Sequence, residues 1–252
     1  MKKADLKTNL RIFADPVEVA RHAGEELLKR AEFAVRQNGR FTVVLSGGST
    51  PKRLYQYLAE KALTPEFLKS LWPHVHFFWG DERTVSPDHA ESNYHTAYEN
   101  FLSKLKLPAA NIHRMKGESA DPAKAAADYE AELRAFFKLV PGELPRFDLV
   151  FLGMGPDGHT ASLFPGRDTA LENQRLTVAP WVAKFNTHRI TLTPAVLNNA
   201  ACVLFLVTGE DKAETLEQVL NGDCPPARFP VQLIRPVHGE LFWFVDQAAT
   251  SS

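Results

Sequence analysis

The sequence predicts an α/β protein whose sheet is mostly parallel and covered by helices on both faces. Short apolar segments alternate with longer segments of helical periodicity along most of the chain, and this alternation is typical of parallel strands joined by crossover helices. Several short segments, such as Phe41–Leu45 (FTVVL), are apolar on both sides, as expected of a strand buried on both faces. Because the 252 residues include no linker-like stretch, we expect one domain over residues 1–252.

The first two elements have clear boundaries. A weak strand is expected at Leu10–Phe13. Asp15 and Pro16 follow it, and these residue types are favoured at the N-cap and at the first position of a helix. An apolar stripe at helical spacing then runs to about Gln37. Gly39 is expected to end this helix.

The later elements follow from the same two periodicities. Apolar runs predict strands at Phe41–Leu45, Val75–Trp79, near Ile112, and at Phe147–Leu152, Leu176–Ala179, Arg189–Leu192, Val203–Val207 and Leu241–Val245. Helical spacing predicts helices at Pro51–Leu58, Ser92–Leu102, Ala123–Phe137 and Asp211–Leu220. This order indicates a doubly wound, Rossmann-like sheet with helices on both faces.

Composition and charge exclude several classes of protein. Hydrophobic residues make up 44% of the chain and charged residues 23%, which is typical of a globular protein. The net charge of −1 lacks the basic excess of a nucleic-acid-binding protein, so an anionic ligand would need a local positive site. No stretch approaches the roughly 18 apolar residues of a membrane span, and the N-terminus lacks the apolar core of a signal peptide. We therefore expect a cytoplasmic protein that binds neither nucleic acid nor membrane.

The cysteines and histidines do not indicate a metal site. Cys202 lies in an apolar run and is expected in the core, whereas Cys224 lies beside two prolines in an expected loop. Neither the cysteines nor the histidines are spaced as zinc ligands are. We expect no metal and no disulfide framework.

Three segments rich in small, polar and charged residues are expected as loops, and each follows an expected buried strand. They are Ser46–Thr50 (SGGST), Gly80–Arg83 (GDER) and Gly153–His159 (GMGPDGH). In an open parallel sheet, ligands bind beyond the carboxyl ends of the strands. If the three strands are parallel neighbours, the segments meet at one edge of the sheet and form a site there.

The segment Ser46–Thr50 could bind a phosphate group. Gly47 and Gly48 allow the backbone to approach a ligand closely, Ser49 and Thr50 offer hydroxyl groups, and the helix behind them directs free N–H groups outward. The GK[ST] ending of a Walker A loop is absent. A flexible turn with a helix-capping hydroxyl explains the same residues equally well.

Charged residues in the second segment and further along the chain could serve an anionic ligand. Asp81, Glu82 and Arg83 could supply a carboxylate, an orienting partner and a guanidinium group. Arg189 and Lys212 could each neutralise a phosphate at the same edge of the sheet. A solvated turn for the first three residues and surface salt bridges for the other two are the alternatives, unless the geometry brings them together.

The segment Gly153–His159 contains the spacing G-x-G-x-x-G but does not fit a dinucleotide-binding loop. Pro165 and Gly166 would end any following helix after about two turns, which is too short for a crossover. An irregular loop that presents Asp157 and His159 on one side fits better. Histidine is the natural general base near neutral pH, and a nearby carboxylate can fix its tautomer. A structural role is the usual alternative for a single histidine.

Together, the motifs resemble those of the 6-phosphogluconolactonase family. The matching stretches are SGGSTP, GDER followed by SNY, GMGPDGHTASLFPG and RITLTP, in this order over most of the chain. The glucosamine-6-phosphate deaminases/isomerases belong to the same superfamily, and the resemblance implies a fold like theirs with no metal and no organic cofactor. The deaminases carry a glutamate where this chain has Phe164 and a tyrosine where it has Arg83. Both differences favour a lactonase.

The resemblance implies hydrolysis of 6-phospho-D-glucono-1,5-lactone to 6-phosphogluconate, the second step of the oxidative pentose phosphate pathway. His159 would act as a general base on water, and Asp157 would orient it. Backbone N–H groups of a glycine-rich loop could bind the oxyanion, and Arg83 could serve either the oxyanion or the phosphate. The residues expected to bind the substrate are Gly47, Gly48, Ser49, Thr50, Asp81, Asn93, Arg189 and Lys212.

Two other functions remain open at this point. The chain could be a glucosamine-6-phosphate deaminase/isomerase, which would release ammonia. It could also be a non-catalytic sensor of sugar phosphates on a related fold, which would bind its ligand without turnover. A phosphorylated sugar lactone is the partner that we expect, and the chain could work as a monomer.

Overall fold

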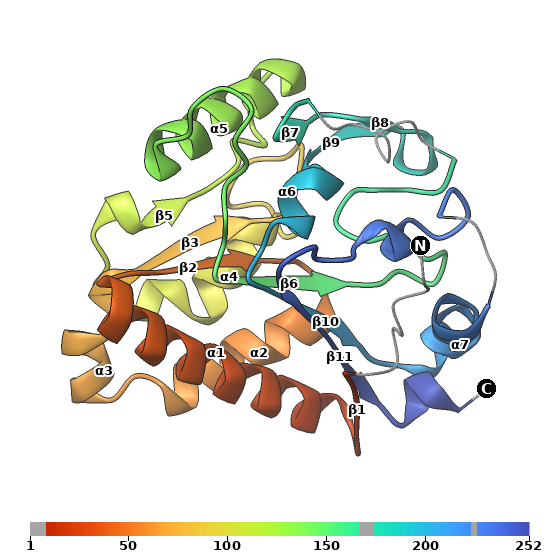
Figure 1. Cartoon of the computed structure of the whole chain (residues 1–252), viewed down its shortest axis with the longest axis horizontal. Helices are drawn as coiled ribbons and strands as arrows, with labels where there is room; N and C mark the ends of the chain where they lie inside the picture. The colour runs from red at the N-terminus through yellow and green to blue at the C-terminus, as the bar shows by residue number, and fades with distance from the viewer. Residues whose placement is uncertain (1–8, 167–173, 223–225, 252) are drawn as a thin grey trace.

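A seven-stranded parallel sheet with helices on both faces forms the centre of the molecule (Figure 1). The computed structural model describes residues 9–166, 174–222 and 226–251. The strands follow the order β1-β11-β10-β6-β2-β3-β5, and each runs parallel to its neighbours. Their bounds are β1 Leu10–Phe13, β2 Phe41–Leu45, β3 Val75–Trp79, β5 Ile112–His113, β6 Leu149–Gly153, β10 Cys202–Val207 and β11 Glu240–Asp246. The doubly wound fold expected from the sequence is therefore confirmed.

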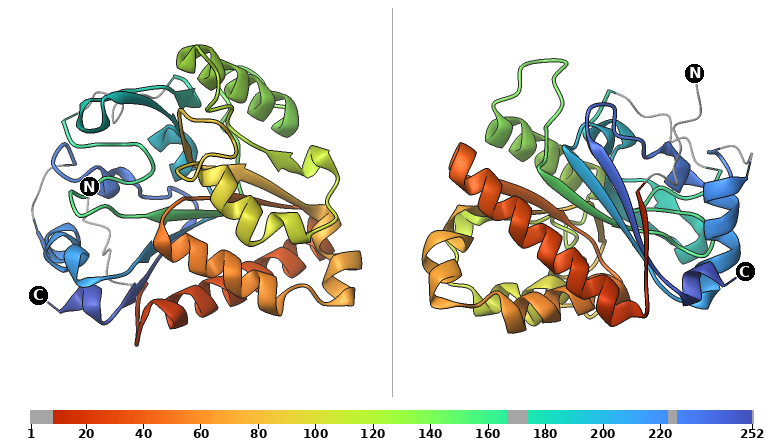
Figure 2. Two further views of the ribbon diagram at one scale, coloured as in Figure 1. Left: turned by 180° about the vertical axis from the view of Figure 1, so that it is seen from behind. Right: turned by 60° about the horizontal axis from the view of Figure 1, so that its bottom comes forward.

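Alternate side chains of the strands enter two hydrophobic cores, one on each face of the sheet. On β2, for example, Val43 and Leu45 belong to one core and Val44 to the other. The first core lies under α1 (Pro16–Asn38), α2 (Ser49–Lys61), α3 (Pro65–Ser70) and α4 (Asn93–Asn100). The second lies under α5 (Pro122–Phe137), α6 (Pro194–Asn198) and α7 (Ala213–Asn221). Figure 2 shows the red and orange helices on one side of the sheet and the green helix α5 on the other.

A smaller antiparallel sheet extends from the carboxyl end of β3. It consists of β4 (Asp81–Arg83), β7 (Thr177–Val178), β8 (Trp181–Val182) and β9 (Thr187–Leu192). The expectation of a loop at Gly80–Arg83 is therefore wrong for its last three residues, because their backbone pairs with β9. This pairing places Asp81 opposite Thr191 and Arg83 opposite Arg189.

Other differences from the expected elements are small. The expected loop Ser46–Thr50 is shorter, because α2 begins at Ser49. Pro51 then lies in the first turn of α2, where a missing N–H group costs no helical hydrogen bond. Strand β6 begins at Leu149, and a 3₁₀ turn at Glu210–Lys212 precedes α7. The elements α3, α6 and β8 were not expected, because segments of two to six residues are too short to show a periodicity.

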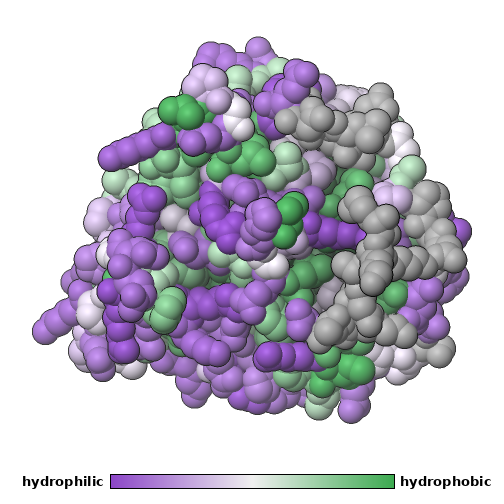
Figure 3. All heavy atoms as spheres, viewed as in Figure 1, coloured by the Kyte–Doolittle hydropathy of each residue, from purple (hydrophilic) through white to green (hydrophobic). Residues whose placement is uncertain are grey.

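One face of the surface and the position of Cys202 show which side chains are exposed and which are buried. The face shown in Figure 3 is mainly hydrophilic, with apolar atoms in scattered areas. Along the part of the chain that the structure describes, no helix is long and apolar enough to cross a membrane. Cys202 is buried in the core, as expected, whereas Cys224 lies outside the described residues.

Helix α1 begins and ends where the sequence predicts. Asp15 Oδ1 accepts hydrogen bonds from the backbone N–H groups of Val17 at 2.7 Å and of Glu18 at 3.0 Å. At the other end, the N–H group of Gly39 donates to the carbonyl of Val35. The Asp15 side chain thus satisfies two N–H groups that the helix itself cannot.

We expect the substitution Asp15→Ala to lower the free energy of unfolding by about 1 kcal/mol, because two N–H groups of α1 lose their acceptor. Asp15→Asn is the matched control, since asparagine caps a helix about as well as aspartate. Urea unfolding followed by circular dichroism measures both values. Equal losses in the two variants would contradict a capping role.

Candidate active site

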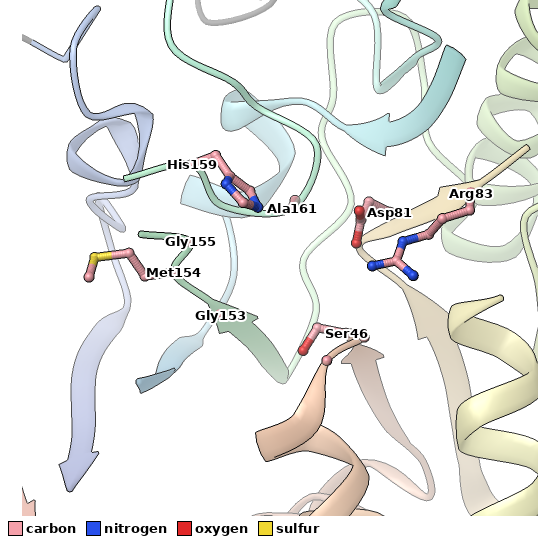
Figure 4. Close-up of a pocket in the computed structure, with 10 residues that line it drawn as sticks. Ser46, Asp81, Arg83, Gly153, Met154, Gly155, His159 and Ala161 are labelled. Carbon is pink, nitrogen blue, oxygen red and sulfur yellow. The ribbon is translucent and has the colours of Figure 1, made fainter. Parts of the chain in front are cut away.

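A cavity of about 190 Å³ lies at the carboxyl end of the parallel sheet. The three polar segments line it together, because β6, β2 and β3 are adjacent in the sheet. The lining residues are Ser46, Gly47, Gly48, Asp81, Arg83, Gly153, Met154, Gly155, His159 and Ala161. Figure 4 shows His159 on one side of the cavity and Asp81 and Arg83 on the opposite side.

On the first side, His159 and Asp157 form a hydrogen-bonded pair. Nδ1 of His159 contacts Oδ1 of Asp157, and the backbone N–H of His159 donates to the same oxygen at 3.3 Å. Burial raises the pKa of the Asp157 carboxyl, but hydrogen bonds from His159 and from Lys184 outweigh burial and lower this pKa below its ordinary value. The carboxylate therefore stays ionised. Because it contacts Nδ1, Nε2 is the ring nitrogen of His159 that remains for a reactant.

Close packing fixes the orientation of the His159 ring. Phe164 stacks on the imidazole with 4.5 Å between ring centroids. On the chain just before the pair, Gly155 donates its N–H to the carbonyl of His159 at 2.9 Å. A Cβ atom at Gly155 would lie 2.1 Å from the imidazole ring, so only glycine leaves room for the ring in this position.

On the opposite side, Asp81 is held by two buried side chains. Its Oδ1 accepts from Asn93 Nδ2 at 3.1 Å, and its Oδ2 accepts from Ser162 Oγ at 2.7 Å. Asn93 is 1% exposed and does not line the cavity, so it acts through Asp81 and not directly on a ligand. A Cβ atom at Gly47 would lie 1.8 Å from Asn93 Oδ1, which shows how closely this loop packs against Asn93.

Glu82 anchors the start of helix α4. Its buried carboxylate accepts from the backbone N–H groups of Arg83, Asn93 and Tyr94 and from Ser92 Oγ. Burial raises the pKa of Glu82, and the three backbone donors act in the opposite direction. Glu82 thus orients the backbone of β4 and of the start of α4 beside the cavity.

The two arginines of the expected site lie side by side. Arg83 and Arg189 are paired in register between β4 and β9. Neither forms a salt bridge with an acidic residue in residues 9–166, 174–222 and 226–251. Burial and the charge of Arg83 lower the pKa of Arg189, and the charges of Asp81, Glu91 and Glu82 offset only part of this effect. Two neighbouring guanidinium groups that form no salt bridge favour the binding of an anion.

Five of the eight expected substrate-binding residues do not line the cavity. Asn93 and Arg189 are described above, and the other three are Ser49, Thr50 and Lys212. Ser49 and Thr50 belong to the first turn of α2, and Thr50 Oγ1 is hydrogen-bonded to Thr208 Oγ1 at 2.7 Å. Lys212 Nζ contacts the carboxylate of Asp211. Any contribution of these residues would therefore come from the edge of the cavity, through the backbone N–H groups of α2 or a movement of Lys212.

Ser46 is a cavity residue that the sequence did not single out. It is 5% exposed, and within the described part of the chain its Oγ has no hydrogen-bond partner. Because a buried hydroxyl without a partner is costly, it is suited to bind a ligand atom. The sequence gives no signal that distinguishes it from Ser49. No group of three or more His, Cys, Asp or Glu residues that could hold a metal ion occurs among the described residues.

The sequence and structure are similar to those of known proteins over nearly the whole chain. The profile of the family described as glucosamine-6-phosphate isomerases/6-phosphogluconolactonase matches residues 14–243. A 6-phosphogluconolactonase of Nostoc sp. is 40% identical over 97% of this chain and 98% of its own, and one of Synechocystis sp. is 42% identical over 86% of each chain. The solved 6-phosphogluconolactonase of Trypanosoma cruzi superposes with a TM-score of 0.87 at 29% identity and covers 100% of this chain and 99% of its own.

A monomeric glucosamine-6-phosphate deaminase also shares the fold. It superposes with a TM-score of 0.77 over 97% of this chain and 99% of its own, at 17% identity. At this identity the likeness extends to the fold alone. It agrees with the expectation, drawn from the resemblance, that the fold is like that of the deaminases.

We expect Glu82→Gln to lower the free energy of unfolding by about 1–3 kcal/mol, because an amide NH₂ group would face backbone donors in place of an acceptor oxygen. Glu99→Gln is the matched control, since Glu99 lies on α4, the helix that Glu82 anchors, with a side chain that is 65% exposed. The control is expected to change stability by less than about 0.5 kcal/mol. Urea unfolding measures both, and similar values for the two variants would contradict the anchoring role.

Proposed function

The chain belongs to the family of glucosamine-6-phosphate isomerases and 6-phosphogluconolactonases, and we propose that its cavity hydrolyses 6-phospho-D-glucono-1,5-lactone to 6-phosphogluconate. This reaction is the second step of the oxidative pentose phosphate pathway. One observation carries the proposal: a His159–Asp157 pair faces Arg83 across a single cavity, and Arg83 lies beside Arg189. Relatives named for this activity match over nearly the whole chain.

His159 acts as the general base and then as the general acid. Its Nε2 takes a proton from a water molecule as the water oxygen attacks the lactone carbonyl carbon. The resulting tetrahedral intermediate carries a negative charge on the former carbonyl oxygen. The imidazolium then donates its proton to the ring oxygen as the bond between that oxygen and the carbonyl carbon breaks. Asp157 keeps the proton on Nδ1 and stabilises the imidazolium between the two transfers.

The size of the cavity indicates how the substrate lies. At about 190 Å³ it is smaller than the roughly 300–1,000 Å³ of most ligand pockets, so it holds the lactone ring while the phosphate lies at its mouth. We assign Arg83 and Arg189 to the phosphate, because an anion relieves the repulsion between the two guanidinium groups. The first turn of α2 and Lys212 add positive potential from the edge.

The sugar and the oxyanion use the remaining polar groups of the cavity. Asp81, fixed by Asn93 and Ser162, accepts hydrogen bonds from sugar hydroxyl groups. The buried hydroxyl of Ser46 is a further partner for the sugar. Backbone N–H groups of the glycine-rich segments that line the cavity are the donors for the oxyanion. Because both sheets contribute to this cavity, we also propose that residues 1–252 act as one domain.

The side chain at position 164 argues against a deaminase. A deaminase of this superfamily needs a carboxylate there, and in this chain the phenyl ring of Phe164 stacks on His159 instead. A non-catalytic sensor would have no use for the hydrogen-bonded pair of His159 and Asp157. An ammonia assay with glucosamine 6-phosphate distinguishes the first alternative, and turnover itself distinguishes the second.

We expect His159→Ala to lower kcat by about 10²–10⁴-fold with little change in KM, because the variant loses proton transfer and keeps substrate binding. In the assay, glucose-6-phosphate dehydrogenase generates the lactone. The rate at which the lactone disappears is compared with the rate of its spontaneous hydrolysis. Asp157→Asn is expected to lower kcat by a comparable factor, up to about 10⁴-fold, because a neutral amide neither keeps the proton on Nδ1 nor stabilises the imidazolium. Wild-type turnover in His159→Ala would disprove the role of His159 as base.

We expect Arg189→Ala to raise KM by about 10–100-fold and to change kcat little, because a hydrogen bond to a charged group contributes roughly 1.5–3 kcal/mol. Lys212→Ala is expected to raise KM by a smaller factor, since Lys212 lies beside Asp211 at the edge of the cavity. Arg134→Ala, which removes a salt bridge to Glu130 on α5, is the control. Unchanged KM values in both test variants would show that the phosphate binds elsewhere.

A further inference from the structure

A third charged residue continues the pair of His159 and Asp157. Lys184 lies in the 3₁₀ turn Ala183–Phe185 between β8 and β9, and its Nζ donates to Asp157 Oδ2 at 3.0 Å. The two carboxylate oxygens of Asp157 thus have separate partners, because Oδ1 contacts His159. We propose that Lys184 is a positioning residue of the reaction. It fixes the rotation of the Asp157 carboxylate and balances part of its negative charge. This inference rests on the proposed function of His159 as base.

The same short turn supports both members of the pair. Phe185, next to Lys184, packs edge-on against Phe164 with 5.8 Å between ring centroids. Phe164 in turn stacks on the His159 imidazole. The turn therefore contacts the carboxylate through Lys184 and the ring that covers the imidazole through Phe185. Since Asp157 and His159 lie in an irregular segment outside helices and strands, such contacts from another part of the chain decide where they point.

The charge of Lys184 also affects proton transfer. With Lys184 present, part of the negative charge of Asp157 is balanced by an ammonium group. Without it, the full carboxylate charge favours the imidazolium, so that the base becomes protonated at a higher pH. Thr215 of α7 donates to the carbonyl of Pro156, so the start of α7 also packs against this segment. The other charged groups on elements around the segment stay the same in a Lys184 variant, and they include Asp81, Arg83, Arg189, Asp211, Lys212, Glu214 and Arg228.

The test compares Lys184→Met with the wild-type protein in lactone hydrolysis from about pH 5.5 to about pH 7.5, where a histidine base titrates. We expect the acid limb of kcat/KM to move to higher pH by about half a unit, which is the effect of removing one charge several ångströms away in a partly exposed site. We also expect kcat to fall several-fold while KM stays unchanged. Lys184→Arg is expected to restore both the limb and kcat.

The control variant is Lys124→Met. Lys124 forms an exposed salt bridge with Asp128 on α5, with side chains that are 65% and 52% exposed, and this pair takes no part in the cavity. The control should match the wild-type pH profile. A pH profile of Lys184→Met that also matches the wild type would overturn the proposal. The contact between Lys184 and Asp157 would then be an ordinary surface ion pair.

A second measurement separates this proposal from the proposed function. A ring-proton NMR titration of His159 without substrate needs no turnover, and its midpoint should rise in Lys184→Met. If hydrolysis persists unchanged in His159→Ala, the proposed role of His159 as base fails even when the NMR midpoint moves. If hydrolysis depends on His159 and neither the midpoint nor the profile moves, the role of Lys184 fails alone.

Discussion

A buried hydrogen-bond network around Asp81 and Glu82 joins the three segments that form the cavity. Asn93, at the start of α4, donates to Asp81 and packs against Gly47 in the segment after β2. Ser162, in the segment after β6, donates to Asp81 from the other side, while Glu82 binds the backbone of α4. Because a buried carboxylate that loses a partner costs about 1–3 kcal/mol or more, the three segments cannot move independently. The wall that faces His159 is therefore rigid before any substrate binds.

The wall that carries the reacting group is built in a different way. His159 and Asp157 lie outside the helices and strands, and ring stacking, a glycine without a side chain and an ammonium group hold them in place. Such contacts depend on shape and charge more than on backbone pairing. The binding wall can thus keep its geometry through the antiparallel pairing of β4 with β9, while small changes near Phe164 or Lys184 adjust the base itself.

Local signals in the sequence were sufficient for the strands of the large sheet and for the ends of α1, because buried apolar runs and capping residues act over a few positions. The same signals placed Asp157 and His159 together. They could not show that Asp81–Arg83 is a strand, since its partner β9 lies more than 100 positions later. Nor could they show that Asn93 lies behind the cavity wall or that Lys184 reaches Asp157, because both contacts depend on how distant segments fold together.

The position of β1 has a consequence for how the protein forms during translation. Leu10 in β1 pairs with Trp243 in β11, so within the described part of the chain the earliest strand of this sheet has its only neighbour in the latest one. At a synthesis rate of about 5–20 residues per second, β1 waits roughly 10–50 seconds for this partner. During that time the growing sheet ends at β10, whose open edge could pair with another chain. Helix α1, which follows β1 directly and already packs on the sheet, is the element placed to keep β1 near this edge until β11 arrives between them.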